Sequence, residues 1–326
     1  MKPAAWLWLG IPTMLAVGVF CAPPVLAQVP GRSYWKTLSG ANAVPLIVES
    51  MNGNTNPFDP SYTVSPGANV TATMGLVGYL RAFSLFNHAT TAAIIVPVGR
   101  ISGDVDVAGL LVNETARGFG DPTLELCFNI IGPPAQITLV DAMRYEPGFS
   151  LDVIADLAVP IGEYDNTRHL NLGQNRWYGR LGAPVVWQIG PWVPGRRTTL
   201  EFLPGVWLFG ANEDYVGTRL ETDPMFQLDV HLTRDFTERL WGALDGAWYK
   251  GGKSSIDSVE GEELNNVAVG FTLGYQINEN LSLTFGYKST IKDSDPGALQ
   301  MDGFMVSFVA GWHSLIEGAR RLKGEE

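Results

Sequence analysis

The sequence VAVGFTLGYQ, residues 267–276, alternates between large apolar side chains and small or polar ones at every position. A period of two residues is typical of a β-strand with one apolar face. The sequence LSLTFGYK, residues 281–288, repeats the pattern after the short turn Asn278-Glu279-Asn280, so the two segments form a predicted hairpin. The sequence GFMVSFVAGW, residues 303–312, repeats it again and ends in an aromatic residue. These segments indicate an all-β chain.

Alternation alone fits either a soluble sandwich or a membrane barrel, and the lengths of the connections separate the two. About twelve strands can be read from the sequence, each of roughly ten residues, which is the length that a tilted membrane crossing needs. A total of about ten or about fourteen strands also fits the pattern. We place them near 39–50, 70–86, 90–101, 118–131, 150–161, 177–190, 198–211, 224–236, 240–250, 264–277, 281–290 and 302–312. The long polar connections are 51–69, 102–117, 162–176, 212–223, 251–263 and 291–301, with mostly short turns such as 87–89, 237–239 and 278–280 between them.

This asymmetry predicts a transmembrane antiparallel up-and-down β-barrel with short periplasmic turns and long external loops, as in the outer membrane of a Gram-negative bacterium. Segment 132–149 is long although it belongs on the short side, so we expect it to hold a short helix or a periplasmic plug. After the first 27 residues the best apolar run, Ala92–Val98, is broken by Pro97 and is too short for a spanning helix.

Aromatic side chains cluster near the ends of the predicted strands. Amphipathic rings favour the headgroup level of a membrane, so we expect them there. They are Trp177, Tyr178, Trp187, Trp207, Trp241, Trp248, Tyr249, Tyr275, Tyr287 and Trp312.

The first residues resemble a secretory signal peptide, with Lys2, an apolar stretch at 6–20 and a cleavage site at Val25-Leu26-Ala27. Lipid attachment at Cys21 is less favoured because bulky Phe20 precedes it. The predicted organisation is a signal peptide at 1–27, an N-terminal periplasmic segment at 28–38, a barrel at 39–312 and a C-terminal tail at 313–326.

The chain is acidic, with 22 Lys and Arg against 33 Asp and Glu. Loss of Lys2 with the signal leaves 21 minus 33, a net charge of −12. This balance argues against nucleic acid as a partner and against a basic patch that binds anionic lipid. The expected partners are outer-membrane lipid around the barrel, a small-molecule solute, and the machinery that inserts barrels into the membrane.

The sequence predicts no catalytic, cofactor-binding or metal site. It has no His-Glu-x-x-His, no Cys-x-x-Cys and no calcium-loop spacing. Cys127 falls in an alternating strand, which indicates a structural role. Gln227, Asp229 and His231 alternate on a polar face and are predicted to line the lumen. A pair of Asp229 with His231 is the best enzymatic candidate, but barrel interiors are also polar for plain solvation.

Several motifs resemble a known family, the outer-membrane proteins associated with the meta-cleavage pathway of phenol degradation and described as transporters. They are GFGDP at 118–122, VPIGEYD at 159–165 and LNLGQNRW at 170–177, followed in the right order by blocks at 190–192, 205–209, 223–224, 244–245 and 249–252. The motif positions are Gly118, Gly120, Asp121, Pro160, Gly162, Tyr164, Asn171, Gly173, Asn175, Arg176 and Trp177. The tail after Trp312 departs from the family's aromatic terminus.

The resemblance implies a barrel that admits aromatic or other hydrophobic compounds and has no enzymatic activity. Two other classes stay open, namely an outer-membrane enzyme with a lumenal active site and a structural barrel without transport. For Asn171, Asn175 and Arg176 there are likewise two interpretations. Their loop folds over or into the pore, or side-chain to backbone hydrogen bonds hold it in place.

Overall fold

The computed structural model describes residues 29–107, 110–291 and 297–323. The predicted signal peptide and the last three residues of the tail lie outside this part of the chain. The wall is one antiparallel sheet. It contains β1 (Asn42–Gly53), β2 (Asn69–Leu85), β3 (His88–Val107), β4 (Leu110–Phe119), β5 (Thr123–Ile131), β6 (Phe149–Ala158), β7 (Tyr178–Gly182), β8 (Val185–Gln188), β9 (Thr198–Phe209), β12 (Met225–Asp235), β13 (Leu240–Gly251), β16 (Leu264–Asn278), β17 (Leu281–Thr290) and β18 (Met301–Trp312).

The sheet closes on itself and makes a barrel. The first strand, β1, pairs with β2 on one side and with β18 on the other, and β9 pairs with β12. Two positions in the wall are each occupied by two strands, one after the other along the same neighbour. β4 and β5 share the position beside β3, and β7 and β8 share the position beside β6. The barrel therefore has 12 strand positions, as the sequence predicts.

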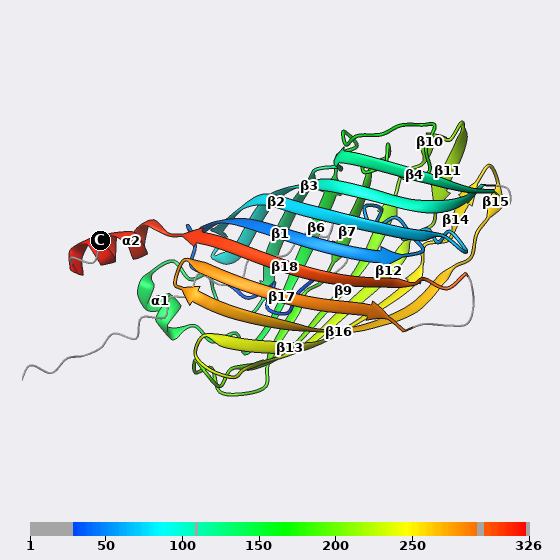
Figure 1. The fold of residues 1–326 in the computed structure, drawn as a ribbon. Helices are drawn as coiled ribbons and strands as arrows, with labels where there is room; N and C mark the ends of the chain where they lie inside the picture. Colours follow the sequence, from blue (N-terminus) through cyan, green and yellow to red (C-terminus); the bar gives the residue numbers. More distant parts are fainter. Residues whose placement is uncertain (1–28, 108–109, 292–296, 324–326) are drawn as a thin grey trace, which may run out of the picture.

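The two ends of the barrel differ (Figure 1). One end carries the turns at 86–87, 236–239 and 279–280 together with the C-terminal helix, and we call it the turn end. The loop end carries the long connections and a separate four-stranded sheet of β10 (Asn212–Tyr215), β11 (Thr218–Thr222), β14 (Ser254–Ile256) and β15 (Val259–Glu260). Outer-membrane barrels place short turns in the periplasm and long loops outside the cell.

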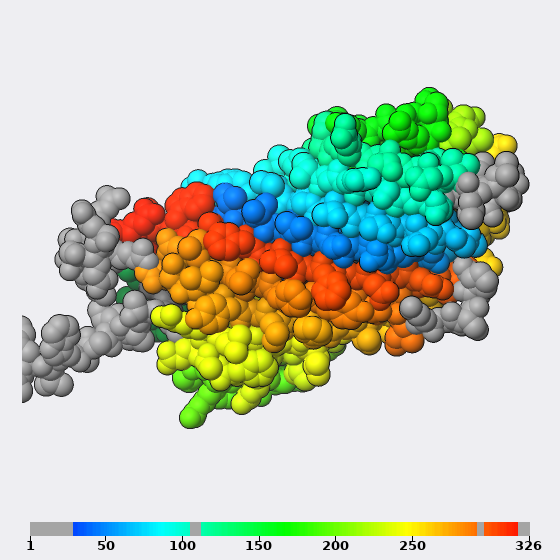
Figure 2. Space-filling view, in the orientation of Figure 1, coloured from blue at the N-terminus to red at the C-terminus, as the bar shows by residue number. Residues whose placement is uncertain are grey.

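The outer face of the wall is apolar, and the inner face is small, polar or charged. On β16 the side chains of Val267, Val269 and Phe271 are exposed, whereas Ala268 and Thr272 are buried on the inside. Figure 2 shows such outward side chains covering the face on which β1, in blue, runs beside β18, in red. An apolar exterior around a polar interior is the arrangement that lipid outside a closed barrel requires.

Two helices flank the turn end. Segment 132–149 contains α1 (Leu139–Arg144), which Thr138 caps with a reciprocal bond to Asp141, so the predicted short helix is present there. The tail contains α2 (Ser314–Lys323). Within the described ranges, no helix has the length and apolar character that crossing a membrane needs.

The prediction of a long loop at 102–117 is wrong. Residues in β3 and β4 pair there from Val98 with Phe119 to Val107 with Leu110, so the segment is a hairpin that continues the wall. The outward residues of this hairpin include the polar Ser102 and Asp104. The alternation of apolar and polar residues from which strands are predicted is therefore absent here.

The prediction of an aromatic belt is partly wrong. Trp187, Trp248, Tyr275 and Trp312 are exposed on the outside, as is Trp177 just before β7. In contrast, four of the predicted rings are buried inside the barrel, because their positions fall on the inward parity of their strands. These are Tyr178, Trp207, Trp241 and Tyr249.

Candidate functional site

The three predicted lumen-lining residues lie buried on the inward face of β12. Gln227 accepts a hydrogen bond from the indole N–H of Trp207 (2.8 Å) and donates one to Asp229 (2.7 Å). Asp229 also forms an ion pair with the ammonium group of Lys288. Polar groups in this part of the lumen therefore satisfy one another.

The structure does not pair Asp229 with His231. Instead Nδ1 of His231 lies 2.7 Å from Oδ1 of Asp245, whose other oxygen accepts a bond of 2.6 Å from the hydroxyl of Thr272. His231 and Asp245 are directly opposite each other on β12 and β13, and such cross-strand neighbours are closer than residues two apart on one strand. Nε2 of His231 is buried without a hydrogen-bond partner among the described residues.

The N-terminal plug, residues 29–41, lies against the inner wall near the turn end. Nη1 of Arg32 is 2.7 Å from Oδ1 of Asp235, and the backbone N–H of Arg32 donates to Glu201 at 2.8 Å. The indole N–H of Trp35 donates to the other oxygen of Glu201, also at 2.8 Å. The described residues of the predicted N-terminal segment thus lie inside the barrel, against the inner wall at the turn end.

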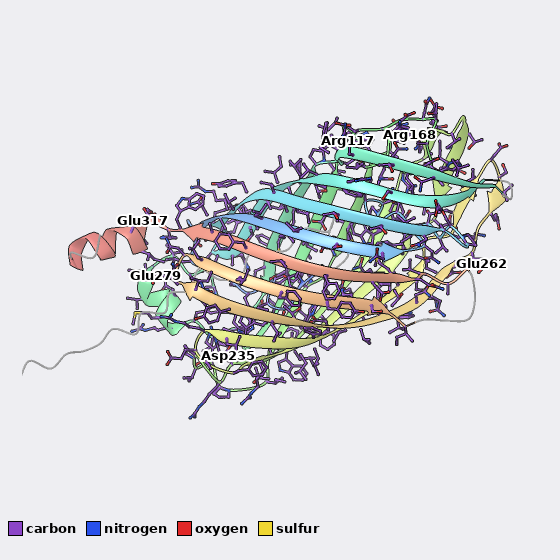
Figure 3. The ribbon with its side chains drawn as sticks, viewed as in Figure 1. Arg117, Arg168, Asp235, Glu262, Glu279 and Glu317 are labelled. Atoms are coloured by element: carbon purple, nitrogen blue, oxygen red, sulfur yellow. The ribbon has the colours of Figure 1, made fainter. Side chains whose placement is uncertain are left out.

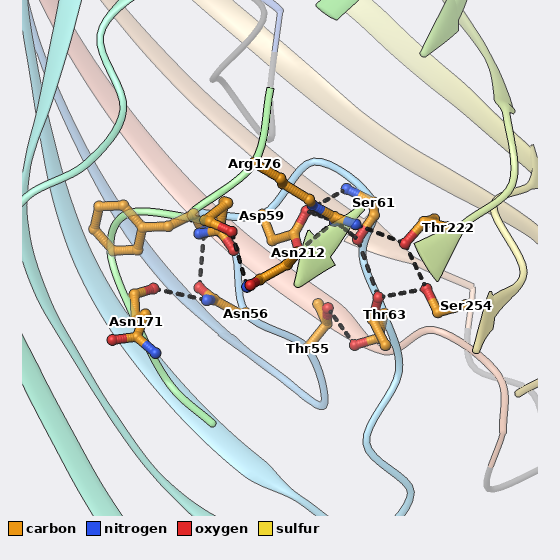
Figure 4. Close-up of polar contacts among 12 residues, drawn as sticks. Thr55, Asn56, Asp59, Ser61, Thr63, Asn171, Arg176, Asn212, Thr222 and Ser254 are labelled. Atoms are coloured by element: carbon orange, nitrogen blue, oxygen red, sulfur yellow. Dashed lines mark hydrogen bonds and ion pairs between the residues drawn. The ribbon is translucent and has the colours of Figure 1, made fainter. Parts of the chain in front are cut away.

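The loop plug, residues 54–68, folds from the loop end into the barrel mouth. Its Asp59 accepts hydrogen bonds from Nη2 of Arg176 at 3.0 Å and 2.8 Å, and Nη1 of Arg176 donates to Thr222 at 2.8 Å (Figure 4). Ser61 also accepts a bond from Arg176, at 3.1 Å. A guanidinium that binds both oxygens of one carboxylate fixes the relative position of the two segments. Arg176 therefore fastens the loop plug to the loop between β6 and β7.

The motif glycines and Asp121 meet where the wall is interrupted between β4 and β5. Asp121 accepts hydrogen bonds from the backbone N–H of Gly162 (2.9 Å) and of Gln174 (2.8 Å). A Cβ on Gly162 would lie 2.6 Å from the carbonyl carbon of Gly120, and one on Gly173 would lie 2.6 Å from that of Gly162. Three stretches of backbone are in contact here, and only glycine fits.

Asn171 and Asn175 hold the same loop from within. Asn171 accepts a bond from the N–H of Asp165 (2.8 Å) and donates to the carbonyl of Arg168 (2.9 Å). Asn175 adopts a positive φ of 51° and donates to Asn212 at 3.0 Å. Side-chain to backbone bonds thus surround Asn171, while Arg176 of the same loop contacts the loop plug.

Tyr164 connects this loop to the small sheet at the loop end. Its hydroxyl donates to the carbonyl of Asp214 (2.8 Å) and accepts from Asn212 (2.9 Å). Partial burial raises the pKa of Tyr164 above its usual value, so the hydroxyl stays neutral and keeps both bonds. The hydroxyl and N–H of Thr167 lower the pKa of Asp165, which keeps that carboxylate ionised.

Gly118, Pro160 and Trp177 frame the loop. Gly118 has a φ of 143° and lies beneath the carboxyl group of Glu163, where a Cβ would be 2.3 Å from Cδ. Pro160 lies two residues after β6 and Trp177 immediately precedes β7. The motif positions therefore surround one loop anchor rather than a reaction centre.

Within the described ranges, no group of three or more His, Cys, Asp or Glu side chains could hold a metal ion. Cys127 is buried on β5, with Sγ 3.7 Å from Asp152. Sequence reasoning did not identify Asp59, the partner of Arg176, or the ion pairs of the N-terminal plug. Asp59 and Arg176 are 117 positions apart, and no local pattern links them.

One solved structure in particular has a similar fold. An outer membrane channel from Pseudomonas putida F1 superimposes with a TM-score of 0.68 at 17% identity, over 87% of this chain and 100% of that one. The β-domain of the Bordetella autotransporter BrkA gives 0.49 at 9% identity, over 83% and 100% of the two chains. The toluene transporter TodX of Pseudomonas putida gives 0.44 at 10% identity, over 91% and 94%. No curated protein sequence matches the chain.

The apolar exterior, the closed sheet and the similarity in fold to an outer membrane channel make this chain an outer-membrane β-barrel. A family model described as "Putative MetA-pathway of phenol degradation" matches residues 52–308, most of its length. The chain therefore belongs to that family.

Proposed function

We propose that the chain is a channel that admits small hydrophobic compounds, aromatic ones among them, through the outer membrane. The observation that carries the proposal is an apolar patch on the inner wall towards the loop end. Met51, Met74, Met225 and Met305 are buried there, each at most 1% exposed. Lipid cannot explain inward methionines, because lipid contacts only the outside of a closed barrel. Methionine is flexible and polarisable, and it suits surfaces that accept varied apolar ligands.

Aromatic rings of the loop plug occupy this patch. Phe58 and Tyr62 are buried in the same apolar cluster as the methionines. The ring of Phe58 reaches the backbone of β3, where a Cβ on Gly99 would be 3.1 Å from its Cζ. The ring of Tyr62 contacts that of Tyr249 edge-on, with centroids 5.3 Å apart. An apolar solute would find the same surroundings once these rings withdraw.

Passage then requires the loop plug to move. Its Asp59 binds Arg176, and its Thr63 has a hydrogen bond of 2.8 Å with Ser254 in the small sheet. Its asparagines also donate to the backbone of other connections, Asn54 to Ala298 and Asn56 to Asn171. These bonds join segments of the loop end rather than strands of the wall. The wall can therefore stay closed while the plug moves, as expected of a gated conduit.

Uptake measurements test the proposal. Cells that lack the chain should take up labelled toluene, phenol and benzoate more slowly than cells in which it is restored. A Phe58→Ala variant should increase uptake further, because it leaves the patch partly uncovered. Phe86→Ala, in the exposed turn after β2, removes an equal ring at the opposite end and should leave uptake unchanged. If uptake of the whole panel is the same with and without the chain, the channel proposal fails.

A lumenal enzyme is the second candidate, and His231 is the observation that favours it. Its bond to Asp245 orients the ring as in a catalytic dyad. However, its buried Nε2 meets no hydroxyl or thiol in the described part of the chain, and a nucleophile must be hydrogen-bonded to its base. We therefore propose that the chain is not an enzyme. Loss of a lipid-hydrolysing activity in His231→Gln, with the barrel intact, would reverse this conclusion.

A further inference from the structure

Three arginines gather on the outer face of the wall towards the loop end. We call them the arginine cluster: Arg100 on β3, Arg117 on β4 and Arg168 in the loop after β6. Figure 3 labels Arg117 and Arg168, which lie near each other at this end of the barrel. Together with Thr115 they line a cleft of ≈ 470 Å³. Arg100 and Arg117 are directly opposite each other in the ladder. Like charges at such a spacing are destabilising unless a counter-ion neutralises them.

Among the described residues, the protein supplies that counter-ion for one of the three. Nε of Arg168 is 3.1 Å from Asp165, and its Nη1 donates to the carbonyl of Thr115. Arg100 and Arg117 have neither an ion pair nor a side-chain hydrogen bond with any described residue. The acidic groups nearby do not change this, since Glu163 lies over Gly118 and Asp104 binds Asn113.

The height of the cluster on the barrel indicates which anion it meets. From His88 at the turn end to Arg100 the strand advances 100 minus 88, or 12, residues. At about 3.3 Å per residue and a tilt near 40°, this corresponds to a height of roughly 30 Å, slightly more than the apolar band of about 25 Å. On the turn-end side of Arg100 the outward residues Ile94 and Val98 are apolar. On its loop-end side the outward residues Ser102 and Asp104 are polar. The cluster therefore lies at the headgroups of the outer leaflet.

We infer that the arginine cluster binds a phosphate group of the outer-leaflet glycolipid, lipopolysaccharide. Guanidinium groups match phosphate with paired hydrogen bonds, and an external site at this height faces phosphorylated sugars rather than solvent. Acyl chains of the same lipid would lie along the apolar surface made by Val98 and Phe119 below the cleft. This inference departs from the expectation drawn from the acidic composition, because net charge averages over the whole chain whereas three arginines concentrate positive charge at one place.

Titration of the purified chain in detergent with bisphosphorylated lipid A tests the inference, with bound lipid counted by native mass spectrometry. Arg100→Gln and Arg117→Gln should each weaken binding about fivefold, and the double variant by about 25-fold. Arg81→Gln is the matched control. Arg81 is on β2 and is also exposed on the outer face of the barrel, but it lies near the turn end. It should bind lipid A like the wild type.

Lipid A without phosphates should bind the wild type as weakly as the double variant binds the phosphorylated form. Equal affinities of wild type and double variant, or no effect of removing the phosphates, would overturn the inference. Displacement of lipid A by inorganic phosphate at comparable affinity would overturn it too, because the site would then take a free anion. Unchanged migration of unboiled variants in gels confirms that the barrels compared are folded.

Discussion

The ammonium group of Lys288 lies 3.1 Å from Oδ1 of Asp229, and the pair joins two strands that are not neighbours in the wall. Lys288 is on β17 and Asp229 is on β12, with β13 and β16 between them. Both side chains are almost completely buried. The pair therefore links two non-adjacent strands on the inner side of the barrel and holds that part of the wall together.

Lys288→Met should destabilise the barrel strongly, because it leaves the Asp229 carboxylate buried with Gln227 as its one remaining partner among the described residues. Removing one member of a buried pair typically costs about 3–5 kcal/mol. Combining it with Asp229→Asn should recover much of that loss. The free energy of unfolding in urea, measured for barrels in vesicles, checks both values. A Lys288→Met barrel as stable as the double variant would contradict this account.

Gly162→Ala should loosen the loop that Asp121 anchors. The added Cβ would lie 2.6 Å from the backbone of Gly120, so one of the two segments must shift. Trypsin should then cleave faster after Arg168, which is exposed on that loop. Gly246→Ala is the control, since the nearest atom to its Cβ is 4.0 Å away. Equal cleavage rates in both variants would show that the glycine contact does not hold the loop.

The strands could be predicted from the sequence because lipid imposes a period of two on every wall segment. The prediction for 281–290 coincides with β17, and that for 264–277 is one residue short of β16. Where the wall extends past the membrane, as in the hairpin of β3 and β4, the exterior becomes polar and the pattern disappears. The acidic composition likewise gave no sign of a local cluster formed by Arg100 and Arg117.

For the interior, the sequence predicted which residues point inward but not which residues they contact. Parity placed Asp229 and His231 in the lumen, but their partners depend on register and on strands across the barrel. His231 meets Asp245 through pairing of β12 with β13, and Asp229 meets Lys288 from a strand further along the wall. The contact of Arg176 with Asp59 depends on two loops that share no local pattern, so only the folded chain reveals it.

Val269→Arg should destabilise the inserted barrel by about 2–4 kcal/mol if the site is near the middle of the bilayer, since an arginine there loses its hydration. Val269 is 51% exposed on the outer face of β16. Val259→Arg, in the small sheet at the loop end, should be nearly neutral, because that side chain faces water. The same unfolding measurement in vesicles compares the two. Equal costs would mean that the face of β16 does not contact lipid.

Glu201→Leu should release the N-terminal plug. Both oxygens of Glu201 accept bonds from the plug, one from the backbone of Arg32 and the other from the indole of Trp35, and leucine leaves these two donors buried without acceptors. The plug should then leave the turn end for part of the time. Trypsin should cut after Arg32, which is 2% exposed in the docked state. Liposomes that contain the variant should also swell faster in small sugars than those with wild type.

Glu238→Leu is the control for this prediction. It removes an exposed carboxylate at the same end and should change neither result, which separates loss of the plug contact from loss of charge. If the plug stays protected in Glu201→Leu, then the bonds of Arg32 to Asp235 and Thr233 are enough to hold it, and the bonds to Glu201 are not what keeps the plug in place.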